Sequence, residues 1–81
     1  MKNNRNLEII DSVSNVFFFD HSKELKNCTT KEELEVAMHE ATEEYNLLRN
    51  HYEENHPEIA GLLDYQFKRV NDIFETIKRN L

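Results

Sequence analysis

The sequence predicts a small all-α protein of three helices, in which the second and third form a long antiparallel hairpin. The 81 residues contain one Gly, one Pro and no Trp, a composition that favours helices over a sandwich of short strands. Apolar residues recur at helical rather than alternating spacing over most of the chain's second half. The single proline divides that stretch into residues 31–55 and 57–80. No linker or repeat marks a second domain, so residues 1–81 are interpreted as one domain.

The N-terminal segment is expected to form a helix over about residues 5–19. Apolar side chains from Leu7 to Phe17 recur at helical spacing. The apolar run at residues 16–19 is also compatible with a short buried strand, because four apolar residues do not define a period. Residues 20–27 are expected to connect this first helix to the second, with room for one helical turn.

Two overlapping capping boxes mark the start of the second helix. Thr29 with Glu32, or Thr30 with Glu33, places a hydroxyl and a carboxylate three residues apart, so that each can satisfy a free backbone N–H of the first turn. Thr30 is the preferred cap because the apolar stripe begins directly behind it. That stripe, which predicts a helix over residues 31–55, consists of Leu34, Ala37, Met38, Ala41, Tyr45, Leu48 and Tyr52.

Pro57 ends the second helix and begins the third. A proline disfavours the α conformation in the residue before it, here His56, and its missing N–H costs nothing in the first turn of a helix. Lys78 and Arg79 lie at the other end, where positive charge complements the last carbonyls. The apolar stripe of this helix consists of Ile59, Leu62, Leu63, Phe67, Val70, Ile73, Phe74, Ile77 and Leu81.

Negative charge concentrates on the second helix. The chain has 16 acids and 10 bases, for a formal net charge of −6, but residues 32–64 contain ten acids and a single base, Arg49. A helical projection places eight glutamates opposite the apolar stripe, over an axial rise of about 33 Å. One DNA strand of that length carries about ten phosphates. The eight are Glu32, Glu33, Glu35, Glu40, Glu43, Glu44, Glu53 and Glu54.

Val36 and Leu47 interrupt this acidic face, and Tyr65 is predicted to point outward from the third helix. Together with the eight glutamates they are the candidate partner-binding residues, as apolar anchors within an acidic rim. Isolated exposed aliphatic residues are ordinary, however, and an acidic face can serve solubility alone. A protein contact surface and a merely solvated face are therefore both compatible with the pattern.

Several classes of chemistry lack the residues they require. One glycine excludes a Gly-rich phosphate loop, and the lone Cys28 allows neither an intramolecular disulfide nor a zinc cluster, which suits a reducing cytoplasm. His39 lies one turn from Glu35 and Glu43, so a histidine and a carboxylate could together bind a metal ion. However, His39 projects toward solvent rather than into a bundle. We therefore expect no enzymatic activity, no metal and no cofactor. Cys28 precedes a helix start, a position that can lower a thiol pKa, so its reactivity is left open.

The expected partner is a protein. The bases are scattered, without the interleaved aromatics typical of direct nucleic-acid binding, and no apolar run is long enough to span a membrane. The leading hypothesis is a small regulator or inhibitor that acts as a DNA mimic and occupies the basic cleft of a nucleic-acid-binding protein. In composition and size alone, the chain resembles the acidic inhibitors encoded by phages and other mobile elements. The alternative is a helical adaptor or homodimer that binds a partner helix through apolar residues, since two long apolar stripes suit a four-helix bundle.

Overall fold

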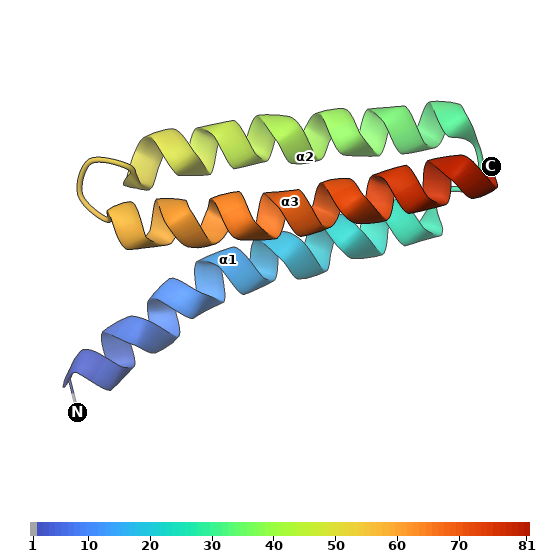
Figure 1. The fold of residues 1–81 in the computed structure, drawn as a ribbon. Helices are drawn as coiled ribbons and strands as arrows, with labels where there is room; N and C mark the ends of the chain where they lie inside the picture. The colour runs from blue at the N-terminus through green and yellow to red at the C-terminus, as the bar shows by residue number, and fades with distance from the viewer. Residues whose placement is uncertain (1) are drawn as a thin grey trace.

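The computed structural model describes the backbone of residues 2–81 and the side chains of residues 12–81. Over this part of the chain it contains three helices and no strand, namely α1 (Lys2–Asn27), α2 (Lys31–Tyr52) and α3 (Pro57–Asn80) (Figure 1). The all-α prediction is therefore confirmed. Neither α1 nor α2 contains a glycine or proline, and the proline of α3 occupies its first position, so no residue breaks a helix from within.

α1 is longer than predicted. It continues without a break through residues 16–19 and 20–27, so the strand alternative is wrong and the expected connecting segment is helical. The sequence prediction ended the helix where its apolar stripe ended, but the polar His21 is buried and extends the inward face to Leu25. Phe17, His21 and Leu25 are spaced four residues apart, which places them on one side of the helix.

Thr30 caps α2, as predicted. It has extended backbone angles (φ −127°, ψ 159°), and its hydroxyl accepts a hydrogen bond from the N–H of Glu33 at 3.1 Å. The return bond differs from the expected box, because the Glu33 carboxylate accepts from the N–H of Thr29 at 3.2 Å and from the Thr29 hydroxyl at 2.8 Å. These bonds hold the pKa of Glu33 below its ordinary value, and those from Thr29 contribute most. Both threonines therefore serve one cap.

The second helix ends before the predicted Asn55. α2 closes at Tyr52, and residues 53–55 form a turn after which the His56 N–H donates to the Tyr52 carbonyl at 2.7 Å. His56 has φ −141°, outside the helical region, and Pro57 is the first residue of α3, as predicted. The chain uses the turn residues to reverse direction before the proline, which is why the last turn of the expected helix is absent.

α2 and α3 lie side by side and run in opposite directions (Figure 1). The Tyr45 ring stacks on that of Phe67, with centroids 4.2 Å apart. The Tyr45 hydroxyl donates a hydrogen bond to the carboxylate of Asp64, which also accepts from Arg49 Nε at 2.9 Å. A ring stack and a polar cluster therefore join the middle of α2 to the first half of α3.

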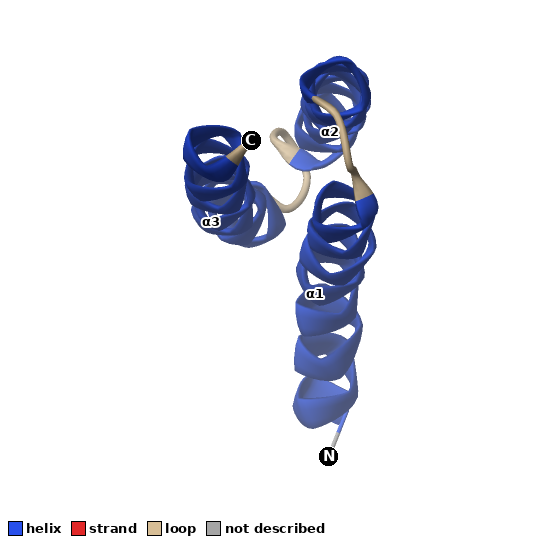
Figure 2. Cartoon of the chain, turned by 90° about the vertical axis from the view of Figure 1, so that its right-hand side faces the viewer, coloured by secondary structure: helices blue, strands red, loops and turns tan. Residues whose placement is uncertain are grey.

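α1 packs on this pair through its C-terminal half, whereas its N-terminal half diverges from both other helices (Figure 1, Figure 2). Its contact with α3 is partly polar. Gln66 Nε2 donates to Asn15 Oδ1 at 3.1 Å, and the Arg69 guanidinium lies 4.0 Å from the centre of the Phe18 ring. The molecule is consequently elongated, with principal extents of 46 × 22 × 14 Å.

The inward stripes of the three helices meet in one core. Its buried apolar members are Phe17, Leu25, Leu34, Ala37, Ala41, Ile59, Leu63, Val70 and Phe74. Leu81, predicted to close the third stripe, is exposed beyond the end of α3. Leu7, predicted to open the first stripe, lies outside the described side chains.

Candidate protein-interaction surface

The side chains predicted to bind a partner are exposed. All of those predicted on the second helix lie on α2 or in the turn that follows it, where Glu53 and Glu54 are found beyond the helix end. The full set of exposed candidates is Glu32, Glu33, Glu35, Val36, Glu40, Glu43, Glu44, Leu47, Glu53, Glu54 and Tyr65.

Tyr65 is separated from the others. It lies on α3, and the Arg69 guanidinium is 5.9 Å from the centre of its ring. The same guanidinium lies over the Phe18 ring of α1, so Tyr65 belongs to the α1–α3 side of the molecule. The structure therefore does not bring Tyr65 together with the acidic residues of α2.

Two of the eight glutamates contact a permanently charged base. Glu35 pairs with Lys78 of α3 at 3.5 Å, and Glu53 pairs with Arg49 at 2.6 Å. Arg49 also bonds Asp64, and this hydrogen bond and the carboxylate charge raise the pKa of the guanidinium. The acidic face is therefore neutralised locally at two points near its ends.

Histidines contact two further glutamates. His39 Nε2 lies 2.9 Å from Glu43, and His21 Nε2 lies 2.9 Å from Glu44. A neutral imidazole leaves the charge of a carboxylate in place, so these contacts cancel it only when the histidine is protonated. Glu33 is engaged in the cap of α2. Among the side chains of residues 12–81, no ion pair forms at Glu32, Glu40 and Glu54.

The seam between α1 and α2 is hollowed along its length. Three adjoining hollows of about 490, 480 and 450 Å³ lie along it. The first two share Glu24 and Glu40, and the last two share Glu44, so they form one continuous depression. We call it the α1–α2 groove. Facing positions along it are Val13, Val16, Asp20, Glu24 and Cys28 on one side and Tyr52, Leu48, Glu44, Glu40 and Val36 on the other.

The groove separates the two apolar candidates of α2. Val36, 60% exposed, lines one end of the groove together with Ala37 and Cys28. Leu47, although close to Val36 in helical projection, is 72% exposed and does not belong to the groove. The two residues therefore occupy different environments, which their spacing in the sequence does not indicate.

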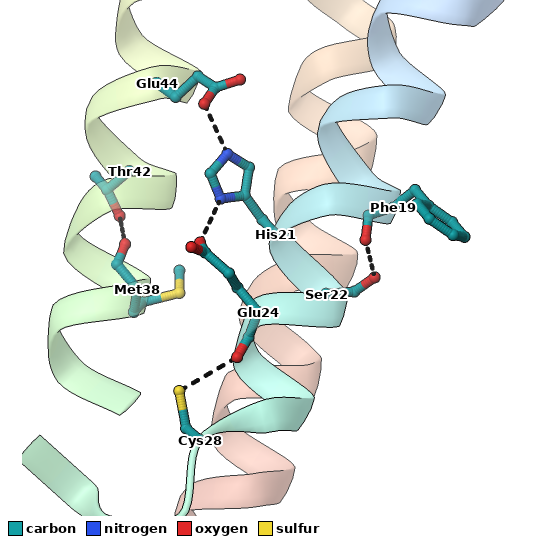
Figure 3. A network of polar contacts seen from close by, with 8 residues as sticks. All are labelled: Phe19, His21, Ser22, Glu24, Cys28, Met38, Thr42 and Glu44. Atoms are coloured by element: carbon teal, nitrogen blue, oxygen red, sulfur yellow. Dashed lines mark hydrogen bonds and ion pairs between the residues drawn. The ribbon is translucent and has the colours of Figure 1, made fainter. Parts of the chain in front are cut away.

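His21 forms the floor of the middle of the groove. It is 6% exposed, and its ring lies between the carboxylates of Glu44 and Glu24, with Nδ1 3.8 Å from Glu24 (Figure 3). The Phe17 ring packs beside it, with centroids 4.8 Å apart. Nδ1 is buried without a hydrogen bond. Sequence reasoning missed this residue, although its place four residues from both Phe17 and Leu25 was a detectable signal.

Cys28 and His39 lie in different surroundings. The Cys28 thiol donates to the carbonyl of Glu24 at 3.3 Å, and burial raises its pKa, with further contributions from the charges of Glu33 and Glu24. The expectation that the helix start could lower this pKa is therefore wrong. The His39–Glu43 pair is exposed, and no group of three or more potential metal ligands occurs within residues 12–81.

No helix in the described part of the chain is both long and apolar enough to cross a membrane. Comparison with protein-family models, with curated proteins and with solved structures finds no significant match to this chain.

Proposed function

We propose that this protein is a small acidic regulator or inhibitor that binds another protein through the exposed carboxylates of α2. The observation that carries the proposal is the row of eight exposed glutamates, of which two are paired with lysine or arginine. Binding rather than catalysis is its proposed mode of action, and a cytoplasmic location suits its single free thiol.

The preferred partner is a protein with a basic, nucleic-acid-binding surface. Six of the carboxylates lie on α2 between Glu32 and Glu44, over an axial rise of about 18 Å, and one DNA strand of that length carries about five phosphates. Folding stability explains only part of this row, since exposed carboxylates near the C-terminal end of a helix interact unfavourably with its carbonyls. Glu54, which lies just beyond α2 without an ion pair among the described side chains, is an example. DNA mimicry accounts for charges that the fold does not use.

The test is retention of host nucleic-acid-binding proteins on the immobilised chain and their release by duplex DNA. Retention should fall steeply between about 50 and 200 mM salt, as expected for contacts that replace phosphates. The double variant Glu40→Gln with Glu54→Gln should lose binding. Its matched control, Asp72→Asn with Glu75→Gln, removes two exposed charges from α3 and should keep it. Retention that survives the α2 variant, or is lost equally in both, contradicts the proposal.

A second candidate function is a helical adaptor or homodimer that binds through apolar residues. The observation that favours it is the exposure of Val16, Phe19, Val36, Leu47 and Tyr65, each at least half accessible. Apolar association is nearly insensitive to salt, in contrast to charge mimicry. Light scattering over a range of protein concentrations, in low and high salt, distinguishes a salt-resistant dimer from a monomer that binds basic proteins.

A further inference from the structure

We propose that the α1–α2 groove binds one cationic amphipathic helix of the partner protein, apolar toward both ends and basic in its middle. This inference rests on the proposed function, because it specifies the part of a basic partner that the acidic surface recognises. It goes beyond the row of eight glutamates because it assigns half of the binding surface to α1.

The groove has the dimensions of a helix site. From Val13 to Asn27 the axis of α1 rises about 21 Å, which corresponds to about four helical turns. The facing residues of α2 run from Tyr52 back to Val36, antiparallel to α1. Two helices side by side leave a furrow between them that a third helix can fill with its own side-chain ridge.

Charge and polarity vary along the groove in a defined order. Its middle is lined by four carboxylates and one lysine, so it is strongly acidic. These residues are Asp20, Glu24, Glu40, Glu44 and Lys23.

Both ends of the groove contain apolar side chains. One end is lined by Val16, Leu48 and Tyr52. The other end is mixed, because Val36 and Ala37 line it together with the carboxylates of Glu32 and Glu33. The two apolar ends lie about 18 Å apart, the rise of about twelve residues of helix. A complementary helix therefore carries apolar side chains about eleven or twelve residues apart, with lysine or arginine between them.

Charge complementarity favours such a partner over a second copy of this chain. The copy has a net charge of −6, and the inward apolar stripes of its three helices are already buried in its own core. Carboxylates that face each other across the groove would repel an acidic occupant and attract a basic one.

The experiment uses a synthetic alanine-based peptide of about 16 residues with blocked ends, leucines near each end and lysines between. Binding to the full-length chain is measured by fluorescence anisotropy at low salt. The control peptide has the same composition, with the leucine and lysine positions exchanged. We expect the peptide with leucines near its ends and lysines between them to bind at least about tenfold more tightly than the control peptide.

Two matched variants locate the site. Glu40 and Glu54 are both exposed and free of ion pairs among the described side chains, but Glu40 lines the groove and Glu54 does not. Glu40→Lys should weaken peptide binding about tenfold or more, and Glu54→Lys by less than about threefold. Val36→Ser and Leu47→Ser provide the same comparison for the apolar end. Circular dichroism confirms that each variant is folded.

Three outcomes would contradict the proposal that the α1–α2 groove binds a basic helix of the partner. Equal weakening by Glu40→Lys and Glu54→Lys means that the whole acidic face attracts the peptide, which leaves the proposed function standing without the groove. Equal binding of both peptides, or of neither, removes the groove as a helix site. A dimer that is lost in Val36→Ser and that competes with the peptide shows that a second copy occupies the groove. Failure of the proposed function itself is detected separately, by the retention experiment with host proteins.

Discussion

Asp64 links α2 to α3, and replacing it with asparagine gives the sharpest test of this packing. Its carboxylate accepts hydrogen bonds from the Tyr45 hydroxyl and from Arg49 Nε. The Tyr45 hydrogen bond lowers the pKa of Asp64 most, and the hydrogen bond and charge of Arg49 lower it further, against the opposing effect of burial. Asp64→Asn keeps the shape of the side chain but removes the charge that both donors recognise.

The expected loss is about 1–2 kcal/mol in the free energy of unfolding near neutral pH. A hydrogen bond to a charged group contributes about 1.5–3 kcal/mol. The Asp64 side chain is 44% exposed, however, and solvent reduces the contribution of such pairs toward about 1 kcal/mol. For a chain with a total stability of about 4–12 kcal/mol, this change is measurable. It corresponds to a fall in Tm of about 4–8 °C for each kcal/mol lost.

The stability difference between wild type and Asp64→Asn should depend on pH in a defined direction. Because the folded-state pKa of Asp64 lies below its unfolded value of about 3.9, its stabilisation is complete above that value. The stabilisation is lost as the pH falls through the lower, folded-state pKa. The difference between wild type and Asp64→Asn should therefore be largest near neutrality and shrink in strong acid, where both side chains are neutral.

The assay is urea unfolding followed by far-ultraviolet circular dichroism, at about pH 7 and at about pH 2. Asp72→Asn is the control, because Asp72 lies on the same helix, is exposed, and makes no ion pair within residues 12–81. Its effect should stay within about 0.5 kcal/mol. A stability difference for Asp64→Asn that is as large at low pH as at neutral pH would refute the assignment to the carboxylate charge.

Three further outcomes follow from the caps, the glycine and the thiol. Thr30→Ala should lower the free energy of unfolding by about 0.5–2 kcal/mol in urea, because the Glu33 N–H loses its acceptor. Gly61→Ala should raise it by about 0.5–1 kcal/mol, since the added Cβ meets no atom within 4 Å and alanine favours the helix. Cys28 should react with a disulfide reagent more slowly than a model thiol at neutral pH, because burial raises the pKa of Cys28. When the chain is unfolded in urea, Cys28 should react as fast as the model thiol.

Local sequence signals determined where α2 and α3 begin and which of their faces point inward. A capping hydroxyl, a proline and a 3.6-residue apolar period each act over a few residues, so their consequences do not depend on the rest of the chain. This is why Thr30 and Pro57 were placed correctly. It also explains why Leu34, Leu63 and Phe74 could be assigned to the core from their spacing alone.

The tertiary structure decided what those signals do not contain. His21 is buried because α1 lies against α2, and that burial allows the helix to continue past its apolar stripe. Glu35 meets Lys78 across 43 positions of sequence, whereas Glu40 meets no base among the described side chains. A helical projection distinguishes the solvent-exposed face of a single helix from its buried face. The groove, and the division of the glutamates into paired and unpaired, arise only when two such faces come together, because contact between helices depends on how all three stripes pack at once.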